Sequence, residues 1–173
     1  MRNQDKALTP LMISNLFLFI TLVFLSIWIS YSGNTYWSDA ALKDFWVQMA
    51  DLSVFFAALS VSLWLIKKII LVLKKKGATR VSRVNGTTLL LLRNAHITGG
   101  WLAFALGLGH SLFFFLRLPW GSNPVDTGII TLTAMTLLFT FGLLYQYKRS
   151  KVTVRSWHLI LAVIFSLFLI MHM

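Results

Sequence analysis

The fold is decided by an apolar stretch at residues 94–116, which reads NAHITGGWLAFALGLGHSLFFFL and contains no charged residue. The hydrocarbon core of a bilayer is about 30 Å thick, so a helix needs about 20 consecutive apolar residues to cross it. The stretch therefore predicts a transmembrane helix. Its two histidines, His96 and His110, would then lie inside the membrane.

Four further stretches of this kind flank the first one, at residues 11–31, 51–73, 127–147 and 156–173. The chain has 173 residues, of which 57% are hydrophobic and 12% are charged, a composition typical of membrane proteins. We keep the first stretch as a span because it lacks a convincing signal-peptide cleavage site. The sequence predicts one domain over residues 1–173, an all-α integral membrane protein that forms a five-helix transmembrane bundle.

The basic residues sort to one side of this predicted bundle. One side holds 14 of them, Arg2, Lys6, Lys67, Lys68, Lys74, Lys75, Lys76, Arg80, Arg83, Arg93, Lys148, Arg149, Lys151 and Arg155, against 2 on the other, Lys43 and Arg117. Cytoplasmic loops are enriched in Lys and Arg. We expect a multi-pass protein of the cell membrane, namely the cytoplasmic membrane of a bacterium. Its N-terminus would lie inside and its C-terminus outside. The basic run at 74–76 is explained by topology, and no nucleic-acid partner is expected.

The longest outer loop is expected at residues 31–50, where aromatic residues such as Trp37 would anchor at the membrane interface, as would Trp120 in the shorter outer loop. Asp51 would cap the second helix from the outside. Four of the five carboxylates lie in or beside these outer loops.

The histidines repeat with one spacing on two different predicted helices. His96 and His110 are 14 positions apart, and so are His158 and His172. Fourteen helical steps return to within about 40° of the starting direction and rise about 21 Å, so each pair faces one way at two levels. Because the two helices run in parallel, His96 would match His158 and His110 would match His172. Two such imidazole pairs are what two six-coordinate haem b groups require.

Other chemistries are constrained by composition. The chain has no Cys, which excludes thiolate-bound zinc, Cys-ligated iron-sulfur clusters and covalently attached haem. Phosphate-binding, nucleotide-binding and zinc-protease motifs are absent from the sequence. A divalent-metal or proton pathway is the main rival to haem, but it would lack a carboxylate inside a predicted span. A haem-free anchor subunit and a cation transporter also remain open.

Arginines accompany the predicted ligands. Arg93 and Arg155 each precede an inner histidine by three positions, so they could reach the propionates of an inner haem. Arg117 would serve the outer haem. The alternative is that all three simply extend to the membrane surface and follow the sorting of positive charge.

Small and aromatic residues lie between the histidines. Gly100 and Gly107 share the histidine face of their helix and would leave room for a flat group, although glycine in membrane helices often serves helix contact instead. Phe165 lies about midway between the two histidines of its helix and could occupy the gap between two cofactors. The alternative for Phe165 is an ordinary aromatic residue of the bundle core.

This layout resembles the ferric reductase transmembrane domain shared by ferric reductases, NADPH oxidases and the membrane subunit of bacterial methionine sulfoxide reductase. The resemblance rests on His96, His110, His158 and His172, which match the family's haem-ligand positions, and on the segment at 155–158, Arg-Ser-Trp-His. It covers all five spans. Cytochrome b of the quinol-oxidising bc complexes uses the same histidine spacing, but its ligand helices run in the opposite direction across the membrane.

The resemblance implies an electron-transfer function with two haem b groups. The family has a sixth span, often followed by a cytoplasmic flavin and nicotinamide domain, whereas this sequence ends one residue after His172. We therefore expect electrons from a quinol or a separate inner reductase protein. The outer acceptor would be oxygen, ferric iron, a quinone or a partner protein. Whether the chain is itself an oxidoreductase or a non-catalytic anchor or electron-transfer subunit of a redox complex stays open.

Overall fold

The computed structural model describes residues 2–36, 38–77, 84–119, 121–147 and 152–173, and their secondary structure is entirely helical. The helices are α1 (Arg2–Tyr36), α2 (Asp39–Lys75), α4 (Gly86–Arg117), α5 (Asn123–Tyr147) and α6 (Val152–His172). All five contain stretches long and apolar enough to cross a bilayer. The predicted class, an all-α integral membrane protein with a five-helix transmembrane bundle, is confirmed.

The helices extend beyond the predicted spans, most of all α2. The predicted loop at residues 31–50 is wrong, because α1 continues to Tyr36 and α2 begins at Asp39. The start of α2 is fixed by Ser38, whose hydroxyl accepts a hydrogen bond from the backbone N–H of Ala41 at 3.2 Å. A helix of 37 residues is about 55 Å long, so α2 projects well past the hydrocarbon core. Trp37 and Trp120 lie outside the described residues.

The other helix starts also precede their apolar stretches. The predicted spans at 94–116, 127–147 and 156–173 correspond to α4, α5 and α6, which begin at Gly86, Asn123 and Val152. At the start of α4, the Asn85 side chain accepts from the backbone N–H of Thr88 at 2.9 Å. Asn85 thus sets the start of α4, because the backbone N–H groups of a first helical turn need acceptors wherever the apolar sequence begins.

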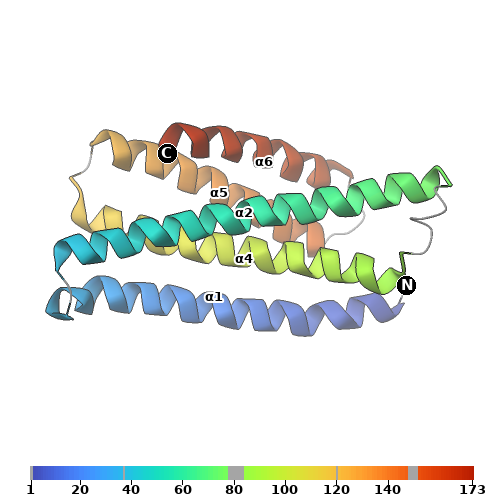
Figure 1. Ribbon diagram of the computed structural model, residues 1–173, viewed down its shortest axis with the longest axis horizontal. Helices are drawn as coiled ribbons and strands as arrows, with labels where there is room; N and C mark the ends of the chain where they lie inside the picture. The colour runs from blue at the N-terminus through green and yellow to red at the C-terminus, as the bar shows by residue number, and fades with distance from the viewer. Residues whose placement is uncertain (1, 37, 78–83, 120, 148–151) are drawn as a thin grey trace.

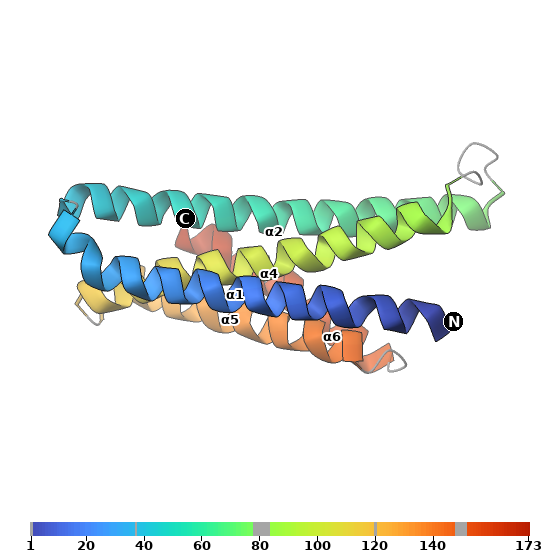
Figure 2. The same cartoon turned by 90° about the horizontal axis from the view of Figure 1, so that it is seen from below.

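The helices alternate in direction, with α4 in the middle of the bundle in both views (Figures 1 and 2). α4 packs against α1, α2 and α5, whereas α6 packs against α5. α2 ends where α4 and α6 begin, so α4 and α6 run in the same direction, as predicted (Figure 1). The basic residues Lys74, Arg93 and Arg155 belong to that end of the bundle, and Asp39 and Asp126 belong to the opposite end.

Small residues allow α2 to lie close to α4. A Cβ atom added to Gly107 would meet the Ser53 hydroxyl at 3.1 Å, and one added to Gly99 would overlap the Ser60 hydroxyl. The Ser53 hydroxyl donates to the carbonyl of Ala103 at 2.7 Å. Close approach through glycine and serine, joined by interhelical hydrogen bonds, is typical of helix packing in membranes.

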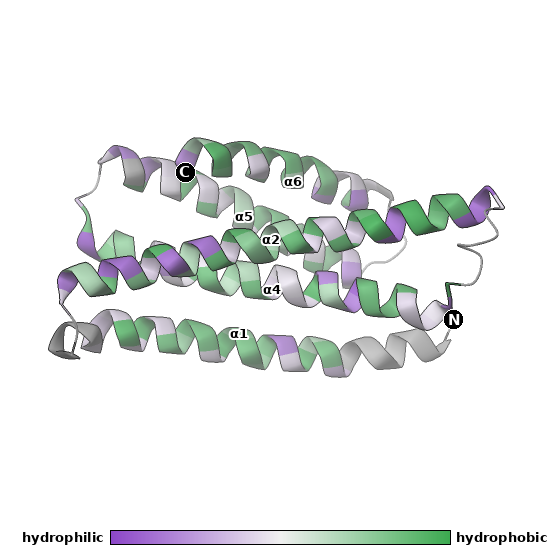
Figure 3. Ribbon diagram, viewed as in Figure 1, coloured by the Kyte–Doolittle hydropathy of each residue, from purple (hydrophilic) through white to green (hydrophobic). Residues whose placement is uncertain are grey.

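The outward faces of the helices are apolar. Phe17, Phe24, Leu65 and Ile170 are among the exposed large hydrophobic residues, and Figure 3 shows the hydrophobic colour along most of α6 and the middle of α1. Exposed apolar side chains on long helices are what a lipid environment accommodates. The fold is therefore that of a multi-pass membrane protein.

Candidate functional site

The four histidines lie on α4 and α6, two helices that do not pack directly against each other. Among the described residues, no Cα atom of α4 lies within 8 Å of a Cα atom of α6. The imidazole rings of His110 and His172 nevertheless reach a centroid separation of 6.4 Å. Because both helices run in the same direction, the 14-residue spacing puts His96 and His158 at a common level, toward the end where α4 and α6 begin. His96 bonds there to Ser60 of α2, and His158 to Leu138 of α5.

The separation of His110 and His172 suits two ligands of one metal atom. Metal–nitrogen bonds of about 2 Å on each side, plus about 1 Å from each coordinating nitrogen to its ring centre, give roughly 6 Å between the two rings. The observed ring separation is 6.4 Å. The outer pair therefore has the spacing that bis-imidazole ligation needs.

Backbone carbonyls determine the protonation of three imidazoles. The Nδ1 atom lies 2.8 Å from the Ser60 oxygen in His96, 2.9 Å from the Trp46 oxygen in His110 and 3.1 Å from the Leu138 oxygen in His158. A carbonyl oxygen can only accept, so Nδ1 carries the hydrogen in each case. The neutral ring then leaves the Nε2 lone pair available as a ligand.

The fourth imidazole contacts a hydroxyl. The Nδ1 atom of His172 lies 3.0 Å from the Thr127 hydroxyl oxygen, and that hydroxyl also lies 2.9 Å from the carbonyl of Asn123. When the hydroxyl hydrogen is donated to Asn123, the hydroxyl oxygen can accept from Nδ1–H of His172. Three histidines thus hold Nδ1–H in a hydrogen bond, the arrangement typical of metal-ligating histidine, and Thr127 can accept the same bond from His172.

Two glycines of α5 make room for the histidines of α6. A Cβ atom added to Gly128 would lie 3.3 Å from Cε1 of His172, and one added to Gly142 would lie 3.1 Å from Cε1 of His158. Gly128 and Gly142 are themselves 14 positions apart. This pair was not predicted from the sequence, although its period, which matches that of the histidines, is a signal that could have identified it.

Two cavities border the outer imidazole pair. The larger, about 360 Å³, lies between α2, α4, α5 and α6, and the smaller encloses about 190 Å³. Both are lined by His110, Ser111, Gly128 and His172. Ligand cavities in proteins typically measure about 300–1,000 Å³ and are mainly apolar. The larger cavity falls within this range and is lined mainly by apolar residues, so the residues beside the pair fit a bis-imidazole haem.

Two of the predicted cofactor-binding residues line the larger cavity. These are Gly107 and Phe165. Phe165 is also buried, with 7% exposure, in a core cluster that includes Phe104 and Met135, so it serves the bundle core as well. Gly100 is partly buried, and a Cβ atom there would meet nothing within 4 Å. Its contact with a cofactor stays a prediction.

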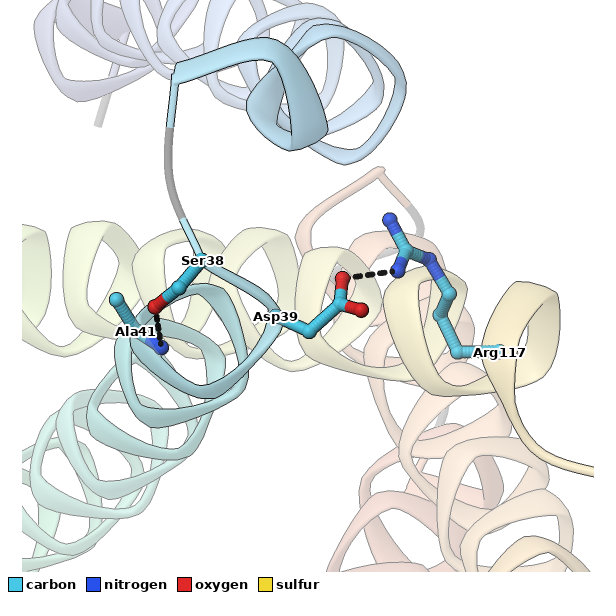
Figure 4. A network of polar contacts seen from close by, with 4 residues as sticks. All are labelled: Ser38, Asp39, Ala41 and Arg117. Carbon is cyan, nitrogen blue, oxygen red and sulfur yellow. Dashed lines mark hydrogen bonds and ion pairs between the residues drawn. The ribbon is translucent and has the colours of Figure 1, made fainter.

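The three predicted arginines occupy different surroundings. Arg117 forms an ion pair with Asp39 at 3.1 Å (Figure 4) and lies over the ring of Phe113 at 5.4 Å. Arg155 is exposed, whereas Arg93 is partly buried on α4, within a turn of His96. The structure thus joins Arg117 to the start of α2. The roles predicted for Arg93, Arg117 and Arg155 toward haem propionates stay predictions.

Asp51 does not cap a helix, and this prediction is wrong. It lies inside α2, twelve residues after Asp39, because the helix begins well outside the apolar stretch. Its exposed side chain lines the larger cavity together with His110 and His172. A carboxylate is therefore part of the wall of the candidate site.

The described residues contain no group of three or more His, Asp and Glu side chains placed to hold a metal ion. A haem needs only two protein ligands, because the porphyrin supplies the other four.

Comparison of the chain with family models, curated proteins and solved structures gives no match.

Proposed function

We propose that this protein carries single electrons across a cell membrane through two haem b groups, one held by His96 and His158 and the other by His110 and His172. The observation that carries the proposal is the hydrogen bonding of the four imidazoles. Nδ1 of each lies within hydrogen-bond distance of an oxygen atom, a main-chain carbonyl in three of them, and an Nδ1–H bonded in this way leaves Nε2 available for a metal. The ring separation of 6.4 Å in the outer pair supports it.

The residues of the chain have separate tasks in this function. The four histidines would supply the axial ligands, and their hydrogen-bond acceptors hold the rings in position. Haem, when bound, supplies a reversible one-electron change at its iron. Two imidazoles at each site would fill both coordination positions that a porphyrin leaves open on its iron. This favours outer-sphere electron transfer over binding of a substrate to the metal.

The direction of transfer follows from the sorting of charge. Lys74, Arg93 and Arg155 belong to the end of the bundle where α4 and α6 begin, and positive charge favours the cytoplasmic side. The N-terminus would then lie inside, with His96 and His158 at the inner level. The donor would be a quinol or a separate inner protein. The acceptor would be oxygen, ferric iron, a quinone or an outer partner protein.

Electron passage through a sealed membrane tests the proposal. Purified protein is reconstituted into vesicles loaded with dithionite, and ferricyanide is added outside. We expect the vesicles to reduce ferricyanide faster than protein-free vesicles, and we expect the variant His96→Leu/His110→Leu to lose this gain. A wild-type rate equal to that of protein-free vesicles would contradict the proposal.

A further inference from the structure

The hydrogen bond that orients His172 differs in kind from the other three. His96, His110 and His158 donate to main-chain carbonyls of Ser60, Trp46 and Leu138. Nδ1 of His172 instead lies 3.0 Å from the side-chain hydroxyl of Thr127. A main-chain carbonyl remains when its residue is substituted. The hydroxyl of Thr127 is lost when Thr127 is replaced by a residue without a hydroxyl. The orientation of His172 therefore depends on the identity of one side chain.

The Thr127 hydroxyl has a second acceptor within reach, so it can accept from His172 while it donates elsewhere. Its oxygen lies 2.9 Å from the carbonyl of Asn123, four residues earlier on α5. A free hydroxyl could accept from or donate to an imidazole nitrogen. When the hydroxyl hydrogen is on Asn123, the tautomer of His172 that bonds to Thr127 is the one that carries Nδ1–H and leaves Nε2 without a hydrogen.

The contacts around Thr127 attach the end of α6 to α5. α6 packs against α5, and the hydroxyl of Thr131 lies 2.8 Å from the carbonyl of Thr127 and 3.2 Å from the carbonyl of Phe168. Phe168 is one turn before His172. Gly128 lets the His172 ring approach α5, because an added Cβ atom would lie 3.3 Å from Cε1. The place and the rotation of this imidazole are thus both set by one short segment of α5.

We propose that Thr127 is a positioning residue that fixes the tautomer of His172 and sets the reduction potential of the outer haem without touching the haem. This inference rests on the proposed function for its effect on potential, but not for its effect on the tautomer. An acceptor at Nδ1–H raises the basicity of the ligand, and a more basic ligand favours the oxidised metal. Loss of the acceptor should therefore raise the potential of the outer haem and leave that of the inner haem unchanged.

The test compares Thr127→Val, which removes the acceptor at similar volume, with Thr127→Ser, which keeps a hydroxyl. Thr133→Val is the matched control, because Thr133 is exposed on the same helix and its hydroxyl bonds to Ile129 of its own helix. Nitrogen-15 NMR of histidine-labelled, dithionite-reduced full-length protein reports the His172 tautomer. A redox titration of the same samples reports the potentials of any bound haem, and their haem content is measured.

We expect wild type, Thr127→Ser and Thr133→Val to share one His172 Nδ1–H signal, and Thr127→Val to shift or lose it. The potential of the outer haem should rise only in Thr127→Val. Haem affinity at that site should also fall by roughly 10–100-fold, because this is the usual effect of removing a hydrogen-bond partner of a ligating histidine. An unchanged His172 signal in Thr127→Val overturns the inference, whether or not haem is bound. A changed signal in protein that contains no haem overturns the proposed function and the effect on potential, while the assignment of Thr127 to the tautomer stands.

Discussion

The rings of His110 and His172 lie 6.4 Å apart, although the described parts of the two helices that carry them have no Cα atoms within 8 Å of each other. Helices that pack directly have axes about 8–10 Å apart. α4 and α6 are instead connected through α5, which contacts both. The two imidazoles thus meet beside α5, and both of them line the neighbouring cavities.

Replacing one histidine should remove one haem and leave the other. We expect His96→Leu or His158→Leu to reduce the haem content from two to one per chain, with the outer haem retained, because each iron needs both imidazoles. His110→Leu or His172→Leu should do the converse. Haem per chain, measured after extraction into alkaline pyridine, checks the prediction. Ser166→Ala, an exposed change on α6, is the control, and two haems retained in all four variants would refute the ligand assignment.

Substitution of either α5 glycine should weaken binding of only the haem beside it. Gly128→Ala places a methyl group 3.3 Å from the His172 ring, and Gly142→Ala places one 3.1 Å from the His158 ring. These separations are tighter than ordinary van der Waals contact, so each ring must shift. We expect Gly128→Ala to weaken the outer haem and Gly142→Ala the inner haem, as seen by titration of each variant with haem. The control is Gly86→Ala, where nothing lies within 4 Å. Equal affinities in all three variants would show that the close approach has no role.

Asp51 should lower the reduction potential of the outer haem. Its carboxylate lines the cavity that contains His110 and His172, and a nearby negative charge favours the oxidised iron. We expect Asp51→Asn to raise this potential by roughly 10–50 mV, a size limited by screening at an exposed site. Asp44→Asn changes a carboxylate that is exposed on the same helix but does not line the cavity, so it should have a smaller effect. Equal shifts in the two variants would indicate a general surface-charge effect and count against a specific role for Asp51.

Arg117 and Asp39 should behave as one ion pair. The pair joins the start of α2 to the end of α4 at 3.1 Å (Figure 4), and exposed pairs of this kind contribute about 0–1 kcal/mol. We expect Arg117→Gln and Asp39→Asn to lower the thermal unfolding midpoint slightly and by similar amounts, with no change in haem potentials. A shift in the outer potential with Arg117→Gln alone would mean that Arg117 serves the haem, as the sequence suggested.

The sequence was sufficient to predict the architecture and the levels of the histidines, because both depend on periodicity. Apolar length identifies the spans, and a 14-residue repeat on parallel helices places His110 beside His172. The acceptors of the Nδ1 hydrogens could not be predicted in the same way. Three of them are main-chain carbonyls, which every residue possesses, so Ser60, Trp46 and Leu138 carry no distinguishing signal.

The position of Asp51 was mispredicted for a different physical reason. Apolarity marks where a helix enters lipid, but a helix can continue beyond the lipid as long as its backbone hydrogen bonds continue. Ser38 caps α2 well before the apolar stretch begins, which leaves Asp51 inside the helix and beside the cavity. In the sequence, only the end of the hydrophobic segment is visible, and that point is not the end of the helix.

The central claim is that each imidazole pair holds one haem, and haem stoichiometry tests it most directly. Wild-type protein is purified in detergent from cells supplied with a haem precursor, and its haem and protein contents are measured together with the reduced-minus-oxidised absorption spectrum. We expect two haem b per chain and a b-type α band with two components in a redox titration. Folded, helical protein that contains no haem would contradict it.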